Sequence, residues 1–137
     1  MDMSAYLPVL VAAIASFVLG FLWHGPVFGK QWMKLSGITQ KDVERAQAKG
    51  GMWKSMLAAL VQQIVTAWVL AMLIVALNVV DAAGALQLSF WLWLGLIVTT
   101  LLNGVLWERR TISLYLFNIV YHLCALVVIS LILALWK

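Results

Sequence analysis

Ionisable side chains are scarce in this sequence. Its 137 residues include five Asp and Glu, nine Lys and Arg and two His, and charged residues make up only 10% of the chain. It contains no Ser/His/Asp set, no phosphate-cradling loop and no paired carboxylates, so a catalytic centre built from side chains is not expected. We therefore expect that the protein is not an enzyme.

Metal-ligating residues are equally few. Cys124 is the single cysteine, which excludes an intrachain disulfide and leaves the redox compartment unreadable. His122 lies near it, but residues at i and i+2 point to different faces of a helix. A metal site needs several converging His, Cys or carboxylate groups, so we expect no metal and no cofactor.

Hydrophobic residues, in contrast, make up 65% of the chain, and the mean hydropathy is +1.02. Soluble domains contain roughly 45–50% apolar residues, so this excess indicates a lipid environment. Four apolar stretches, at residues 6–24, 53–80, 86–107 and 112–136, meet the length of about 20 residues that a membrane-crossing helix needs. The expected fold is all-α, a single membrane domain (residues 1–137) that forms a bundle of four transmembrane helices.

The basic residues indicate how such a bundle is oriented. Five lie within residues 25–52, Lys54 follows, and Arg109 and Arg110 lie between the third and fourth stretches, so eight of the nine flank the same membrane face. Short basic loops stay in the cytoplasm, which predicts a bacterial inner-membrane protein with both termini outside. Because the cations flank apolar segments, membrane orientation explains them better than nucleic-acid binding. The first cation is Lys30, so no cleavable signal peptide is expected.

The loop at residues 25–52 has its own pattern. Phe28, Trp32 and Leu35 recur at helical spacing and predict a short amphipathic helix in the inner interface, which Gly37 would end. Thr39 to Asp42 resembles a capping box that opens a polar helix, so the loop is expected to form a cytoplasmic helical hairpin. Anionic lipid headgroups are the expected partners of the cations along this face: Lys30, Lys34, Lys54, Arg109 and Arg110.

Polar residues inside the apolar stretches are costly in lipid unless they are paired. Counted at about 1.5 Å per residue from the inner boundary, six of them fall near one layer slightly cytoplasmic of the midplane: Gln62, Gln63, Thr99, Asn103, Asn118 and His122. One interpretation of this layer is interhelical hydrogen bonding that fixes the register of the helices. The other is a solute, proton or ligand site, and a metal site is the least favoured.

A second polar group lies at the cytoplasmic mouth of that layer: His24, Glu108, Arg109 and Arg110. Glu108 is either a solvated charge paired with an arginine or a gate to the layer. His24 is expected at the interface, hydrogen-bonded to headgroups or backbone. Since His122 is expected about 15 Å deeper, the two histidines should not share a haem.

Small residues form a stripe along the first stretch, with Ala12, Ser16 and Gly20 at i, i+4 and i+8. Such stripes let helices approach closely. A bundle of four helices encloses little room for a solute path, so we expect a homo-oligomer. The stripe is the candidate contact face between subunits.

Two segments carry a resemblance to a known family. WHGPVFGKQWM (residues 23–33), and LWERRT (residues 106–111) followed by NIVYH (residues 118–122), resemble the two halves of a family of small bacterial membrane proteins, the seventeen-sixty-one domain of unknown function. The resemblance covers nearly the whole chain and implies four membrane helices in a bacterial membrane, but no activity. His24 departs from the pattern, in which tyrosine usually follows the first tryptophan.

Three functions remain open from the sequence. The first is an oligomeric permeation or transport protein that uses the polar layer. The second is a structural or accessory membrane subunit whose basic hairpin binds anionic lipid or a partner protein. A membrane redox protein or enzyme is the third and least favoured.

Overall fold

The structure is a computed structural model that describes residues 3–24, 28–39, 41–42, 44–45 and 52–136. It is all-helical over these residues, with no strand among them. In chain order the elements are α1 (Met3–Leu22), α2 (Gly29–Ser36), α4 (Met52–Ala76), α5 (Ala82–Leu92), the π-helix η2 (Trp93–Val98), α6 (Thr99–Leu106) and α7 (Ile112–Leu135).

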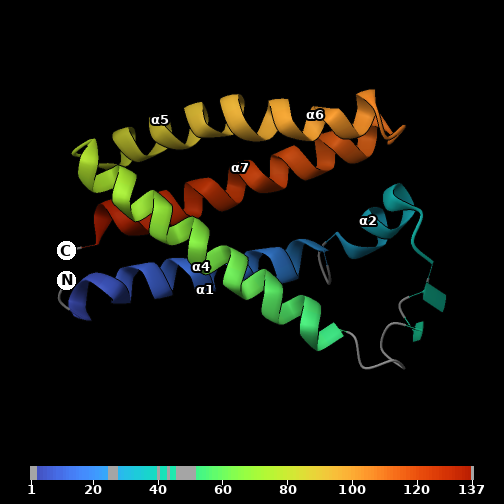
Figure 1. Cartoon of the computed structure of the whole chain (residues 1–137), viewed down its shortest axis with the longest axis horizontal. Coiled ribbons are helices and arrows are strands. Elements are labelled where there is room, and N and C mark those ends of the chain that lie inside the picture. Colours follow the sequence, from blue (N-terminus) through green and yellow to red (C-terminus); the bar gives the residue numbers. More distant parts are fainter. Residues whose placement is uncertain (1–2, 25–27, 40, 43, 46–51, 137) are drawn as a thin grey trace.

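The long helices run back and forth between two ends of the molecule. Figure 1 shows both chain termini and the α4–α5 turn at one end, and α2, the start of α4 and the α6–α7 turn at the other. α7 contacts all the other elements, and α1 and α4 also pack on each other. We call the end that carries α2 and the α6–α7 turn the basic end, because the described cations lie in the segments gathered there: Lys30, Lys34, Lys41, Arg45, Lys54, Arg109 and Arg110.

Three segments are long and apolar enough to cross a membrane: Trp53–Ala76, Ala82–Leu106 and Ile112–Leu135. The apolar part of α1, Tyr6–Leu22, is shorter. Large hydrophobic side chains are exposed along all four segments, among them Leu10, Val65, Leu96 and Leu116. Exposed apolar surface on this scale fits a lipid surround, so the fold is that of a membrane protein.

Small residues set the core. Ala12, Ala13 and Ala67 are fully buried where α1 meets α4, and Leu126 and Ile129 of α7 complete the cluster with Leu70. Alanine brings helix backbones close together, so packing contacts replace the missing hydrophobic drive in lipid.

The small-residue stripe of α1 belongs to this interior. Ala12 and Ser16 are 0% exposed within a single chain, and the position of a Cβ on Gly20 would lie 2.6 Å from the Tyr121 hydroxyl. The stripe therefore packs α1 against α4 and α7. Ala12 and Ser16 are therefore not available as a contact face between subunits, while Gly20 is partly exposed and lines a cavity.

Helix ends follow the local sequence. Gly37 ends α2 with φ 76°, and the N–H of Ile38 donates to the Met33 carbonyl. Asp81 caps α5 by accepting from Gly84 N–H at 2.8 Å, and Thr111 caps α7 by accepting from Leu114 N–H at 3.2 Å.

The capping box predicted at Thr39 to Asp42 is present. The Thr39 N–H donates to the Asp42 carboxylate at 2.9 Å, and the Asp42 N–H donates to the Thr39 hydroxyl at 3.2 Å. Residues 41–42 and 44–45 are helical. The expected end of this helix at Gly50 and Gly51 lies outside the described residues.

The apolar segment Ala82–Leu106 is not a continuous α-helix. Residues 93–98 form a π-helix between α5 and α6, which adds a residue to the local repeat and turns the following side chains relative to an α-helix. At this point the Trp93 indole N–H donates to the Ile119 carbonyl at 2.7 Å, and the Tyr115 hydroxyl donates to the Val98 carbonyl at 2.7 Å. The π-helix thus lies where the segment Ala82–Leu106 is hydrogen-bonded to α7.

Candidate functional site

A cavity of about 410 Å³ lies near the basic end, between α1, α2, α4 and α7. Its polar lining consists of two imidazoles, two amides, a phenol and a hydroxyl: His24, His122, Gln62, Gln63, Tyr121 and Ser55. Phe17, Phe21 and Met56 supply most of the apolar wall. We call this site the histidine cavity.

His24 is held by the last turn of α1. Its Nδ1 lies 3.0 Å from the Gly20 carbonyl oxygen, and because a carbonyl only accepts, Nδ1 donates and Nε2 remains available to a ligand. The ring stands edge-on to Tyr121 and Trp32, with centroids 4.9 and 5.4 Å away. Backbone and aromatic contacts together fix the imidazole at the cavity wall.

His122 follows Tyr121 on α7, with the two ring centroids 5.0 Å apart. The expected separation of the two histidines by depth is wrong, because both line the same cavity. That expectation counted residues from one common plane. In the structure, Gly20 near the end of α1 lies against Tyr121, which follows nine residues after the start of α7, so the helices do not begin at one level.

A hydrogen bond between α1 and α4 lies behind the cavity lining at Gln63. The hydroxyl of Ser16, fully buried on α1, donates to the side-chain oxygen of Gln63 on α4 at 2.5 Å. The buried residues Ala12 of α1, Ala67 of α4 and Ile129 of α7 pack together one to two turns farther from the basic end. The cavity is therefore closed by packing on that side, whereas Met56 and Gln62 are exposed at its rim.

The structure divides the expected polar layer into three places. Gln62, Gln63 and His122 line the histidine cavity. Asn103 and Asn118 line a separate pocket between α6 and α7. Thr99 lines neither: it is exposed, and its hydroxyl donates to the Gly95 carbonyl of its own helical segment at 2.7 Å.

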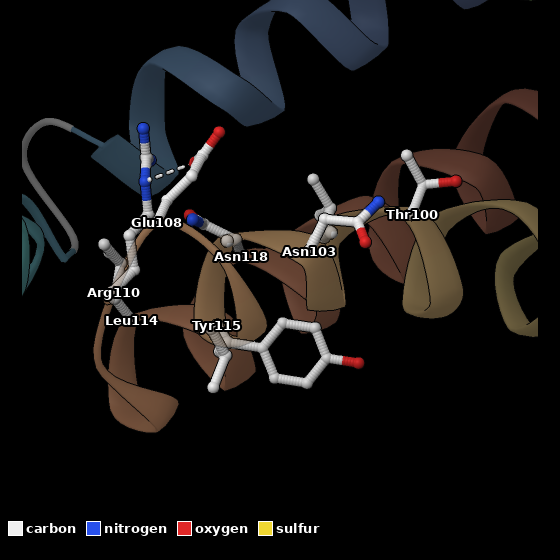
Figure 2. A pocket seen from close by; sticks show the side chains of 10 residues that line it. Thr100, Asn103, Glu108, Arg110, Leu114, Tyr115 and Asn118 are labelled. Carbon is white, nitrogen blue, oxygen red and sulfur yellow. Dashed lines mark ion pairs between the residues drawn. The ribbon is translucent and has the colours of Figure 1, made fainter.

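The pocket between α6 and α7 has a volume of about 260 Å³ and contains the ion pair of the α6–α7 turn. Arg110 Nε lies 3.2 Å from Glu108 Oε2, and both side chains are about 60% exposed. Figure 2 shows this pair beside Asn118, with Asn103 next along α6. We call this site the arginine pocket. Of the four residues expected at the mouth, Glu108 and Arg110 lie here, His24 lies in the histidine cavity, and Arg109 lines neither site.

Three hydrogen-bonding side chains of the histidine cavity were not anticipated: Trp32, Ser55 and Tyr121. Tyr121 carried a usable signal, since a phenol in an apolar run needs a polar environment for its hydroxyl. Ser55 and Trp32 carried none, because their place depends on how α2 and the start of α4 fold over the end of α1.

The described residues contain no group of three or more His, Cys, Asp or Glu that could hold a metal ion. The histidine cavity offers hydrogen-bond donors and acceptors beside apolar walls, which is the usual composition of a small-molecule site.

Comparison with known proteins gives one result. No curated protein and no solved structure matches the chain. One family, described as "Protein of unknown function (DUF1761)", matches residues 7–134, almost the whole chain. The chain therefore belongs to this family of unknown function, as the segments around His24 and His122 indicated.

Proposed function

We propose that the protein is a non-enzymatic, four-crossing protein of the bacterial cytoplasmic membrane, and that it binds a small amphipathic solute in the histidine cavity as a step in its passage across the membrane. The observation that carries the proposal is the convergence of His24, His122, Gln62 and Gln63 on one cavity. Gln63 Oε1 already accepts from Ser16 and His24 Nδ1 donates to the Gly20 carbonyl, so the remaining donors and acceptors of this set are the ones that need a partner in lipid.

The proposed orientation rests on charge. The segments with the described cations gather at one end of the molecule, and the α4–α5 turn at the other end carries none. The positive-inside rule assigns the basic end to the cytoplasm and both termini to the outside. α1 would then cross the membrane in addition to the three longer segments, since its 20 residues extend about 30 Å.

The lining supports the proposed solute class. Imidazole and amide groups can donate to and accept from a polar head, while Phe17, Phe21 and Met56 can cover an apolar body. Exposure of Met56 and Gln62 at the rim gives access from the membrane interface as well as from the cytoplasm.

The packed core supports assembly into a homo-oligomer. Ala12, Ala13 and Ile129 are fully buried beyond the cavity, so a solute cannot continue through one subunit without separating helices. A symmetric assembly supplies a second surface against which α1 and α4 can move.

Flux through reconstituted protein tests the proposal. Liposomes containing the wild-type chain should pass a small amphipathic solute, such as a fluorescent aromatic amine, faster than protein-free liposomes. His122→Ala should return that flux to the protein-free rate, because it removes an imidazole from the cavity wall. Thr99→Ala is the control, since Thr99 is exposed and bonded within its own helical segment. Equal fluxes for wild type and His122→Ala would remove the histidine cavity from transport.

A second function is an accessory subunit that docks through its basic end. It is favoured by α2, where Lys30 and Lys34 are exposed while Trp32 and Leu35 are partly buried, as expected for a helix at an anionic membrane surface. A photoreactive residue at position 41 or 45 should then cross-link one defined protein in cells. Labelling of lipid alone would leave the membrane as the partner of this end.

A further inference from the structure

A distinct lipid site follows from the arginine pocket. We propose that it binds the headgroup of a zwitterionic phospholipid with a primary ammonium, phosphatidylethanolamine, with the phosphate on Arg110 and the ammonium on Glu108. The proposal does not depend on transport through the histidine cavity.

The pocket lies at headgroup level if the helices cross the membrane. It is formed at the α6–α7 turn, where the spans Ala82–Leu106 and Ile112–Leu135 meet. Trp107, which follows α6, is 80% exposed, and tryptophan prefers the membrane interface. Leu101, Val105 and Leu114 line the apolar side of the pocket, where the acyl chains would begin.

The ion pair is arranged to accept both charges of a headgroup. Glu108 pairs with Nε of Arg110, which leaves the four terminal N–H donors of the guanidinium for a phosphate. The Arg110 backbone N–H donates to the Gly104 carbonyl at 2.9 Å, and its Cδ would lie only 3.2 Å from a Cβ on Gly104. Glycine at this position therefore lets the arginine lie close over α6.

The amides of the pocket lack protein partners. Among the described residues, the hydrogen bonds of Asn103 and Asn118 within the fold are backbone bonds, and neither side-chain amide is paired. Figure 2 shows the Asn118 amide beside the ion pair and Asn103 beyond it. At headgroup level these amides can donate to the phosphate and ester oxygens of a phospholipid.

Charge balance selects a zwitterion over an anion. Glu108 already neutralises Arg110, so an anionic headgroup would leave a net negative charge in the pocket. Phosphatidylethanolamine brings one charge of each sign and leaves the net charge at zero. Its ammonium has N–H donors for the Glu108 carboxylate, which the methylated ammonium of phosphatidylcholine lacks.

Native mass spectrometry of the full-length chain with defined lipids tests the site. The wild type should bind phosphatidylethanolamine about fivefold more tightly than phosphatidylcholine or phosphatidylglycerol, as expected for partly exposed charge pairs. Glu108→Gln should abolish this preference and raise the affinity for phosphatidylglycerol by a similar factor, because it frees the charge of Arg110. A preference for phosphatidylethanolamine that survives in Glu108→Gln would overturn the assignment.

Two further experiments distinguish binding in this pocket from a general effect of net charge and from binding of free phosphate. Arg110→Gln should weaken phosphatidylethanolamine binding about fivefold, whereas Arg109→Gln changes the net charge equally, lies outside the pocket and should leave binding unchanged. Equal loss in both variants would show a diffuse charge effect and overturn the site. Inorganic phosphate at millimolar concentration should not displace the lipid, and displacement would show that the pocket binds free phosphate rather than a lipid headgroup.

Discussion

Gly20 decides how closely α1 approaches α7. A Cβ at this position would lie 2.6 Å from the Tyr121 hydroxyl oxygen but 3.4 Å from the next ring atom, Cζ. The conflict is therefore with one oxygen atom, which makes the contact testable by removing that atom. Because Tyr121 also lines the histidine cavity, this contact links helix packing to the shape of the site.

We expect Gly20→Ala to lower the free energy of unfolding by about 1 kcal/mol, as overpacking of a tight contact does. In a Tyr121→Phe background the same substitution should cost close to nothing, because the oxygen it meets is gone. Unfolding by sodium dodecyl sulfate in mixed micelles would measure all four members of this double-mutant cycle.

Gly95→Ala is the matched control for that cycle. A Cβ on Gly95 would meet nothing within 4 Å, so this substitution should be neutral or slightly stabilising. An equal cost for Gly20→Ala with tyrosine or phenylalanine at position 121 would show that the hydroxyl does not limit the approach.

At the scale of elements, the helical residues 41–42 and 44–45 follow the capping box of Thr39 and Asp42. The pKa of Asp42 is lowered because its carboxylate accepts from the Thr39 backbone N–H and, secondly, interacts with the Thr39 side chain. A carboxyl whose folded pKa lies below its unfolded value stabilises the structure above the unfolded pKa, and that contribution is lost as the pH falls through the folded pKa. Acidification should therefore loosen the start of this helix.

Carboxyl carbon NMR of the chain in nanodiscs would check this titration. The Asp42 signal should titrate below the usual range of aspartate, and Thr39→Val, which keeps the backbone N–H but removes the hydroxyl, should raise the pKa part of the way back. If Thr39→Val left the Asp42 titration where it was, the hydroxyl would have no part in the cap.

Periodicity and composition predicted the elements well and their relation to one another poorly. The apolar stretches, the amphipathic helix before Gly37 and the Thr39–Asp42 cap are legible because each depends on neighbouring residues. The π-helix at 93–98 left no signal in an evenly apolar run. It turns α6 relative to α5, and α6 packs beside α7, where Asn103 and Asn118 form a pocket apart from His122.

The same limit explains why His24 and His122 were expected at different depths. Counting residues from the end of a span gives depth only if the spans begin at one level, and α1 and α7 do not. The contact between Gly20 and Tyr121, which brings His24 to the cavity of His122, depends on tertiary packing that no local pattern records. The sequence therefore supplied most of the candidate residues but not their grouping.

At the scale of the whole molecule, the proposed orientation makes a simple prediction. In a Cys124→Ala background, Lys41→Cys at the basic end should react with a membrane-impermeant maleimide only from the cytoplasmic side. Ala83→Cys, exposed next to the α4–α5 turn, should react only from outside. The physical reason is that the translocated turn carries no cation, whereas the retained segments carry seven among the described residues.

Val65→Cys serves as the control for this mapping. Val65 is 56% exposed on α4 but lies in the middle of an apolar span, so a thiol there should resist the reagent from both sides. Reaction of Lys41→Cys from the periplasm would reverse the assigned orientation, and with it the face from which the histidine cavity opens.

The absence of cations from the α4–α5 turn has a consequence for biogenesis. In the proposed topology, residues 77–81 are the only internal loop that must be carried through the membrane, and their one charge, Asp81, already accepts a hydrogen bond from the first turn of α5. Acidic residues resist translocation little, so α4 and α5 can enter the bilayer together as a helical hairpin. The binding residues at the other end never leave the compartment in which the chain is synthesised.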